Sequence, residues 1–188
     1  KKRSKCMINR LRYYINCIRP LHWSKNILLF VPAIVAHELS VDNFSMILVH
    51  FFSFSLIASA GYCFNDYSDI DSDSKHIEKS SRPYASGEVT IYGVLALAGI
   101  MLIAGFSIAI IYMSPPSIVL LLVYITLNIA YTRVFKKIYL VDTICLSFFY
   151  HIRIALGNEV LKETTEKSVS VWFIAFSVFA FLGLAFLK

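Results

Sequence analysis

Long apolar runs, separated by short polar connections, organise the 188 residues of the chain. A helix needs roughly 20 apolar residues to cross the hydrocarbon core of a bilayer, and several runs approach that length. The six runs lie at 20–37, 44–64, 91–113, 117–131, 141–157 and 169–187. The fourth is short, and Lys25 and Pro32 interrupt the first, so these two are the hardest to delimit. The pattern predicts an all-α membrane protein, built as a bundle of transmembrane helices.

Composition supports this fold class and narrows the partners. Hydrophobic residues make up 57% of the chain, charged residues only 16%, and the mean hydropathy is +0.65. These values exclude a soluble domain and indicate an integral membrane protein that is surrounded by lipid. The net charge of +6 is explained by anionic lipid headgroups, so no nucleic acid partner is needed. The four cysteines have no CxxC spacing and are expected to be reduced packing residues.

Charged residues are distributed unevenly between the two sets of connections. If the N-terminus is cytoplasmic, most of the 18 Lys and Arg residues fall on cytoplasmic segments. The opposite connections carry acidic residues such as Glu38, Glu159 and Glu163. This distribution is the one that the positive-inside rule describes. We therefore predict an integral membrane protein, in the bacterial inner (plasma) membrane, whose N-terminus and loop at 65–90 face the cytoplasm.

The loop at 65–90 concentrates acidic side chains between two apolar runs. At helical spacing, one face of this segment gathers Asn65, Asp66, Asp69 and Asp73, while Asp71 falls on the opposite side. Carboxylates that close together repel one another, which indicates a compensating cation. Mg²⁺ takes one or two carboxylates, several waters and the oxygens of a substrate phosphate. We predict that Asp66, Asp69 and Asp73 hold Mg²⁺ and are catalytic. Asn65 would orient that cluster or its water.

Two other interpretations of the acidic loop stand beside the Mg²⁺ site. A solvated loop without a ligand is the usual meaning of a charge cluster. A calcium loop is suggested by Asp69, Asp71 and Asp73, which match the first ligand positions of an EF-hand. The calcium interpretation fails further on, because this chain has Ser74 and Ser80 where an EF-hand requires Gly and Glu.

Basic residues near the aspartates favour a site for metal-bound phosphate. The expected phosphate contacts are Lys25, Lys79, Arg82, Lys136 and Lys137. Cleavage of a diphosphate ester needs such cations, because negative charge on the leaving group grows in the transition state. Any one of these residues alone is better explained as a cytoplasmic anchor. Combined with the aspartates, they predict a Mg²⁺-dependent enzyme.

These residues carry a family resemblance. The pattern NDxxDxxxD at 65–73, followed by Arg82-Pro83, resembles the first aspartate-rich motif of the UbiA superfamily of intramembrane prenyltransferases. The pattern RPxxWxKN at 19–26 resembles the opening of its decaprenyl-phosphate phosphoribosyltransferase branch. Further along, this chain resembles the Tyr-Lys loop of that branch and the helix after it. The matching residues are Tyr131, Lys136, Asp142, Arg153 and Gly157. The resemblance extends over nearly the whole chain.

The resemblance implies a fold of about nine transmembrane helices around a cavity capped from the cytoplasm. The chain at 1–188 would then be one domain that is incomplete at its C-terminus, with six of those helices. In this family Mg²⁺ bridges the aspartates and a diphosphate. The branch implies phosphoribosyl pyrophosphate as donor and a polyprenyl phosphate as acceptor. The alternative is a prenyltransferase that moves a polyprenyl group from its diphosphate to an aromatic or similar acceptor.

Two ionisable residues fall within or beside the fifth apolar run. Arg153 is costly inside a membrane, so it should face the cavity or a partner helix. Asp142 lies 11 positions earlier, too far for a direct pair, and each residue should meet another helix or a ligand. Together with Tyr131, both are candidate substrate-binding residues.

A function of another class also fits the acidic loop. A non-catalytic transporter or scaffold would use the loop only to bind cations, and Asp66→Asn or Asp69→Asn would then leave its function intact. The enzyme interpretation predicts loss of turnover from either change.

Overall fold

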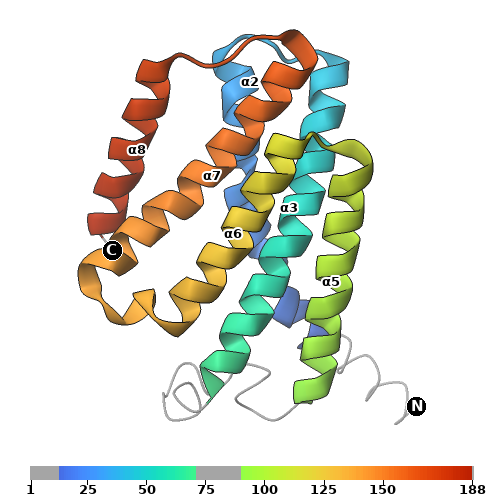
Figure 1. Ribbon diagram of the computed structural model, residues 1–188, viewed down its shortest axis with the longest axis vertical. Coiled ribbons are helices and arrows are strands. Elements are labelled where there is room, and N and C mark those ends of the chain that lie inside the picture. Colours follow the sequence, from blue (N-terminus) through green and yellow to red (C-terminus); the bar gives the residue numbers. More distant parts are fainter. Residues whose placement is uncertain (1–12, 71–89, 188) are drawn as a thin grey trace.

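The computed structural model describes residues 13–70 and 90–187, and within those ranges every regular element is a helix (Figure 1). This confirms the all-α fold class. Three of the predicted site residues lie outside the described residues: Asp73, Lys79 and Arg82. Their proposed roles stay predictions.

Within residues 13–70 and 90–187, four helices are long and apolar enough to cross a membrane. They are α3 (Val41–Ser68), α5 (Ile91–Tyr112), α6 (Pro115–Arg133) and α7 (Tyr139–Thr165). Each covers one of the predicted spans, so the hydropathy pattern located these four correctly. The last predicted span forms α8 (Val171–Phe186), which is apolar but has only 16 residues.

The first predicted span is not a single α-helix. Residues 20–37 form a 3₁₀ helix, η1 (Pro20–Phe30), followed directly by the five-residue α2 (Val31–Val35). Pro20 and Pro32 each stand in the first turn of one of these helices. Proline lacks the amide hydrogen that an uninterrupted α-helix would need at Pro32, so the helix changes type there. The correction matters for function because η1 carries the basic opening motif.

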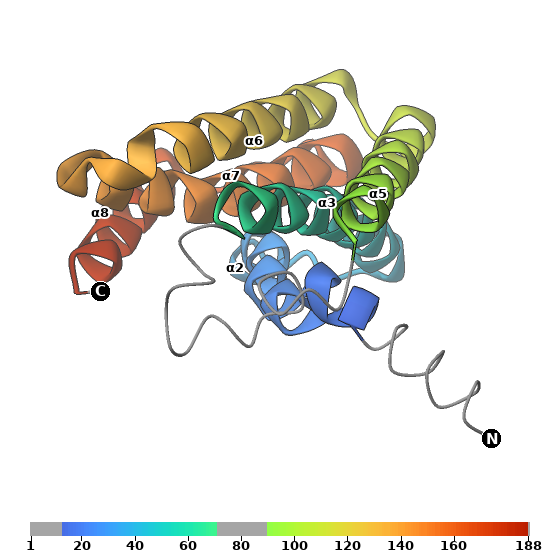
Figure 2. The ribbon, with the colours of Figure 1, turned by 90° about the horizontal axis from the view of Figure 1, so that it is seen from below.

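Helix α3 is the central element of the bundle. It packs against α5, α6, α7 and η1, and Figure 2 shows it between α6 and α7 on one side and η1 and α2 on the other. Ser40 caps its start by accepting a hydrogen bond from the backbone amide of Asn43, at 3.2 Å. The apolar core around α3 includes Phe54, Tyr124 and Leu156. Because α3 is held on all sides, its C-terminal end is a fixed platform.

The segments that carry the predicted aspartates and the Tyr-Lys loop lie at one end of the bundle. The last turn of α3, the last turn of α6, the 3₁₀ turn η2 (Phe135–Lys137) and the start of α7 all lie there (Figure 1). We call this region the aspartate end and define it by residues 65–69, 132–137 and 139–142. It brings together segments that are far apart in the sequence.

Candidate active site

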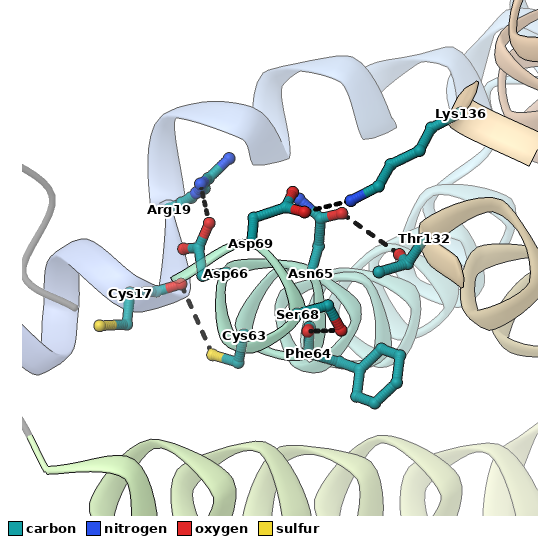
Figure 3. A network of polar contacts seen from close by, with 10 residues as sticks. All are labelled: Cys17, Arg19, Cys63, Phe64, Asn65, Asp66, Ser68, Asp69, Thr132 and Lys136. Carbon is teal, nitrogen blue, oxygen red and sulfur yellow. Dashed lines mark hydrogen bonds and ion pairs between the residues drawn. The ribbon is translucent and has the colours of Figure 1, made fainter. Parts of the chain in front are cut away.

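Three residues of the acidic motif share one face at the end of α3. Asn65 and Asp66 belong to its last turn, and Asp69 is the residue that caps its C-terminus. Figure 3 shows all three side chains on the side of α3 that faces η1 and Lys136. The predicted one-face arrangement is confirmed for these residues. Asp66 is buried, and Asp69 is partly exposed.

Both described carboxylates are paired with cations of the chain. Arg19 donates a hydrogen bond to Asp66, and Lys136 donates one to Asp69 (Figure 3). The like-charge repulsion expected on this face is therefore relieved in part by basic side chains. Arg19 comes from the residue before η1, and Lys136 comes from η2. Two loops thus deliver one cation each to neighbouring carboxylates.

Arg19 holds an unusual backbone conformation. Its φ angle is 53°, in the left-handed region that residues other than glycine seldom adopt. Its guanidinium carbon also lies 5.6 Å from the ring centroid of Tyr62. Strained backbone of this kind persists only where its surroundings enforce it, and it is concentrated at functional sites. Here it directs the side chain toward the end of α3.

Asn65 connects the aspartates to α6. Its side-chain oxygen accepts a hydrogen bond from the hydroxyl of Thr132, at 3.2 Å. Thr132 is buried in the last turn of α6, next to Tyr131. The contact ties the end of α3 to the last turn of α6, just before the 3₁₀ turn that supplies Lys136. Lys137, in the same loop, is exposed.

A cavity of about 160 Å³ opens beside this cluster. Its walls come from η1, α3, α6 and α7, together with Arg19. The polar residues that line it are Arg19, Lys25, Asn65, Asn128, Tyr131 and Arg153, joined by Thr132 and the phenols of Tyr62, Tyr124 and Tyr150. The cavity reaches from the aspartate end to the buried Arg153. It brings together four predicted site residues: Lys25, Asn65, Tyr131 and Arg153.

Arg153 is fixed inside the bundle by a chain of hydrogen bonds. Its Nε donates to the side-chain oxygen of Asn26 at 2.8 Å, and Nη1 donates to the backbone carbonyl of Phe149. Asn26 in turn donates to the hydroxyl of Ser55 at 2.7 Å. The guanidinium carbon also lies 4.9 Å from the ring centroid of Phe54. Neutral groups and an aromatic face therefore hold the cation in place.

No carboxylate pairs with Arg153 in the described part of the chain, although only 3% of the residue is exposed. A buried cation without a counter-charge is costly, because it has lost its water and gained no opposite charge. Since Arg153 lines the cavity, an anion bound there would supply that charge. Asp142 does not do so: it accepts a hydrogen bond from the hydroxyl of Tyr131 at 2.8 Å. Each residue meets another helix, as expected.

A family model described as the UbiA prenyltransferase family matches residues 26–188. The chain belongs to the UbiA prenyltransferase family. The resemblance seen in the motifs is thereby confirmed. Together with the apolar helices, membership makes this UbiA family chain an integral membrane protein.

Curated relatives extend the similarity over most of the chain. The nodulation protein NoeC of Azorhizobium caulinodans is 31% identical over 176 residues, which is 93% of this chain and 55% of that protein. The decaprenyl-phosphate phosphoribosyltransferase of Mycobacterium tuberculosis is 30% identical over 177 residues, which is 89% of this chain and 56% of that protein. The chain spans about half the length of these two relatives.

A solved structure shows the same fold. The chain superposes on a digeranylgeranylglyceryl phosphate synthase with a TM-score of 0.74 and 18% sequence identity. The match covers 93% of this chain and 59% of that one. The helix arrangement described above is therefore a UbiA-type arrangement.

The side-chain oxygens at the aspartate end are of the type that binds a hard divalent cation. Among residues 13–70 and 90–187, no three His, Cys, Asp or Glu side chains are close enough to hold a metal ion together. Asp66 and Asp69 are nevertheless two carboxylates on one face, with the amide oxygen of Asn65 beside them. Mg²⁺ commonly takes one or two carboxylates and completes its shell with water and phosphate oxygens. The residues present match that requirement, and Asp73 lies outside the described residues.

The residues of this UbiA family site that were not among the predicted site residues include three with charged or amide side chains. Arg19 and Asn26 stand in the RPxxWxKN pattern, but only the structure gives them partners, Asp66 and Arg153. Asn128 is the third, and it lines the cavity. A sequence signal for it exists, since residues 124, 128, 131 and 132 recur at helical spacing on one face of α6.

Proposed function

We propose that the UbiA family protein to which this chain belongs is a Mg²⁺-dependent membrane transferase. It transfers the 5-phosphoribosyl group from phosphoribosyl pyrophosphate to a polyprenyl phosphate. The observation that carries the proposal is the buried Arg153, which has no carboxylate partner among the described residues. It lines a cavity whose walls also include Asn65 and Arg19, the residue that pairs with Asp66. The substrate pair is taken from the name of the relative in Mycobacterium tuberculosis, decaprenyl-phosphate phosphoribosyltransferase.

The aspartates would bind the metal-diphosphate end of the donor. Bound Mg²⁺ would neutralise the negative charge that grows on the leaving pyrophosphate. Asp66 and Asp69 would hold the ion, with Asp73 as the expected third ligand. Asn65 would keep this face oriented through its contact with Thr132.

The cations around the cavity would bind phosphate oxygens. Arg19 and Lys136 already lie against the carboxylates, within reach of a diphosphate bound there. Lys25 and Arg153 line the cavity itself. The remaining expected phosphate contacts are Lys79, Arg82 and Lys137, and Tyr131 with Asp142 would form the wall next to the acceptor. Fixed cations of this kind stabilise charge that develops during the reaction.

The proposed reaction is a substitution at the anomeric carbon of the ribose. A phosphate oxygen of the lipid forms a bond to the anomeric carbon, while the bond between that carbon and the pyrophosphate oxygen breaks. Pyrophosphate leaves with the bonding electrons. The chain's contribution is to position the two reactants and to surround the leaving group with positive charge.

Prenyl transfer is the second candidate, and the aromatic lining of the cavity favours it. Tyr62, Tyr124, Phe149 and Tyr150 all contribute to the walls. Aromatic faces attract cations, and ionisation of a polyprenyl diphosphate leaves a carbocation. The acceptor would then be an aromatic or similar molecule. A third, non-catalytic candidate is a membrane protein whose acidic loop only binds cations.

The test uses the full-length protein in detergent with Mg²⁺, labelled phosphoribosyl pyrophosphate and a polyprenyl phosphate. We expect label in the lipid fraction, lost in Asp69→Asn and retained in Asp42→Asn. Asp42 is an exposed residue in the first turn of α3, at the opposite end of that helix, so it is a matched control.

The other outcomes separate the candidates. Transfer only from a labelled polyprenyl diphosphate would replace the phosphoribosyl proposal with prenyl transfer. A folded Asp69→Asn variant with the wild-type rate would refute the catalytic role of the aspartates and favour the non-catalytic candidate.

A further inference from the structure

The side-chain oxygen of Asn128 is buried and has no hydrogen-bond partner among the described residues. The residue itself is 8% exposed and lines the cavity. Buried polar atoms nearly always have a partner, because an unpaired one has lost water without replacing its hydrogen bond. Asn128 also lines the cavity, so a ligand bound there is a candidate partner for its amide.

Close packing of α6 on α3 fixes the position of this amide. A Cβ atom added at Gly61 of α3 would lie 2.8 Å from the side-chain oxygen of Asn128 and 3.0 Å from its amide carbon. Real Cβ atoms essentially never come that close, so any larger residue at position 61 would force the amide of Asn128 to move. Tyr62, next to Gly61, and Tyr124, one turn before Asn128, line the same cavity. The amide is thus held against α3 at the wall of the cavity.

The chemistry of the cavity limits what the partner can be. An amide group exchanges hydrogen bonds with a neutral hydroxyl, whereas Lys25 and Arg153 in the same walls attract phosphate. A ligand with both hydroxyl and phosphate groups could pair with the amide and with the two cations at once. Phosphoribosyl pyrophosphate has ribose hydroxyls next to its phosphates. The transferred group of a polyprenyl diphosphate has no hydroxyl.

We propose that Asn128 is a specificity-determining residue, whose amide forms a hydrogen bond with a hydroxyl of the donor sugar. This inference rests on the proposed phosphoribosyl transfer. A site built to pair with a hydroxyl discriminates against a ligand that lacks it, because the polar group of the site then stays unpaired. Asn128 would favour a sugar donor over a prenyl donor at the same diphosphate site.

The experiment compares two ligands on the full-length protein in detergent with Mg²⁺. Dissociation constants are measured for phosphoribosyl pyrophosphate and for pyrophosphate, which has the diphosphate but no sugar. In Asn128→Ala, we expect binding of phosphoribosyl pyrophosphate to weaken by about three- to tenfold, the range for loss of one neutral hydrogen bond. Binding of pyrophosphate should stay the same.

Two further variants make the result independent of one substitution. Gly61→Ala keeps Asn128 but forces its amide to move, so it should shift the ratio of the two constants in the same direction. It also carries the test if Asn128→Ala does not fold. Asn158→Ala is the control: Asn158 is also buried, but its side-chain oxygen accepts a hydrogen bond from the backbone amide of Val169 at 2.9 Å. The ratio should not change in this control.

Each result decides between the inference and the function on which it rests. Equal weakening of both ligands in Asn128→Ala would show a structural role only and overturn the inference. An unchanged affinity for phosphoribosyl pyrophosphate would overturn it too, while leaving the proposed function in place. If the wild-type protein bound pyrophosphate but no phosphoribosyl pyrophosphate, the proposed function itself would fail, and the inference with it.

Discussion

Gly157 provides a sharp test of how η1 is seated against α7. A Cβ atom added there would lie 2.1 Å from the backbone carbonyl oxygen of Leu29 and 2.9 Å from its carbonyl carbon. Ordinary contact begins near 3.4 Å, so η1 would have to move by more than an ångström. The obstructing atoms are backbone and cannot rotate away. We expect Gly157→Ala to destabilise the protein by about 1–3 kcal/mol or more, the cost of forcing extra volume into a packed interior.

The movement should also reach the cavity. Asn26 lies one turn of η1 before Leu29 and holds the guanidinium of Arg153. Displacement of η1 would therefore loosen Arg153 and lower turnover as well as stability. Misplacement of a functional group by about 1 Å can reduce the rate by around 10²-fold.

The assay is thermal unfolding of the purified variants in detergent, with transferase activity measured below the transition. Gly99→Ala is the matched control, because nothing lies within 4 Å of a Cβ added at Gly99 in α5. Alanine has a higher helix propensity, so this control should be neutral or more stable by up to about 1 kcal/mol. If Gly157→Ala were as stable and as active as Gly99→Ala, the described contact between η1 and α7 would be wrong.

Three further results are expected. Asn26→Leu should keep the fold but lower kcat/KM by about 10- to 100-fold, because Arg153 loses the group that orients it; a wild-type kcat/KM would exclude this positioning role. In a double-mutant cycle of Lys136→Met and Asp69→Asn, the effects on donor binding should couple by about 0.5–3 kcal/mol, and strict additivity would show that their ion pair has no energetic role. Removal of divalent cations with a chelator should abolish donor binding and restoration of Mg²⁺ should recover it, whereas binding that resists the chelator would contradict the proposed metal dependence.

Hydropathy was sufficient for the long helices because lipid demands runs of apolar residues with an internally bonded backbone. The same rule gave no warning that residues 20–37 form a 3₁₀ helix and a short α-helix. Both arrangements bury similar apolar side chains, and what decides between them is one proline and one close contact with a distant helix. Pro32 interrupts the ladder, and Gly157 on α7 admits the carbonyl of Leu29.

Contacts between site residues could be predicted only where those residues are neighbours along the chain. The spacing of Asn65, Asp66 and Asp69 placed them on one face, as found. The partners of these residues are distant in sequence, with 47 positions between Arg19 and Asp66. The contact between Asn26 and Arg153 spans 127 positions. Such pairs depend on how whole helices cross, which a single sequence does not encode in any short pattern.

The ion pairs at the aspartate end have a thermodynamic consequence for the proposed transferase. A divalent cation that bound Asp66 and Asp69 would compete for these carboxylates with Arg19 and Lys136, and an anionic donor would then pair with the two bases. Either ligand alone leaves one set of charges without partners, while the two together exchange partners with no net change in charge. Metal and diphosphate should therefore bind with positive cooperativity, each raising the affinity for the other by the same factor. The two ion pairs of the ligand-free protein would therefore open most readily when the cation and the diphosphate bind together.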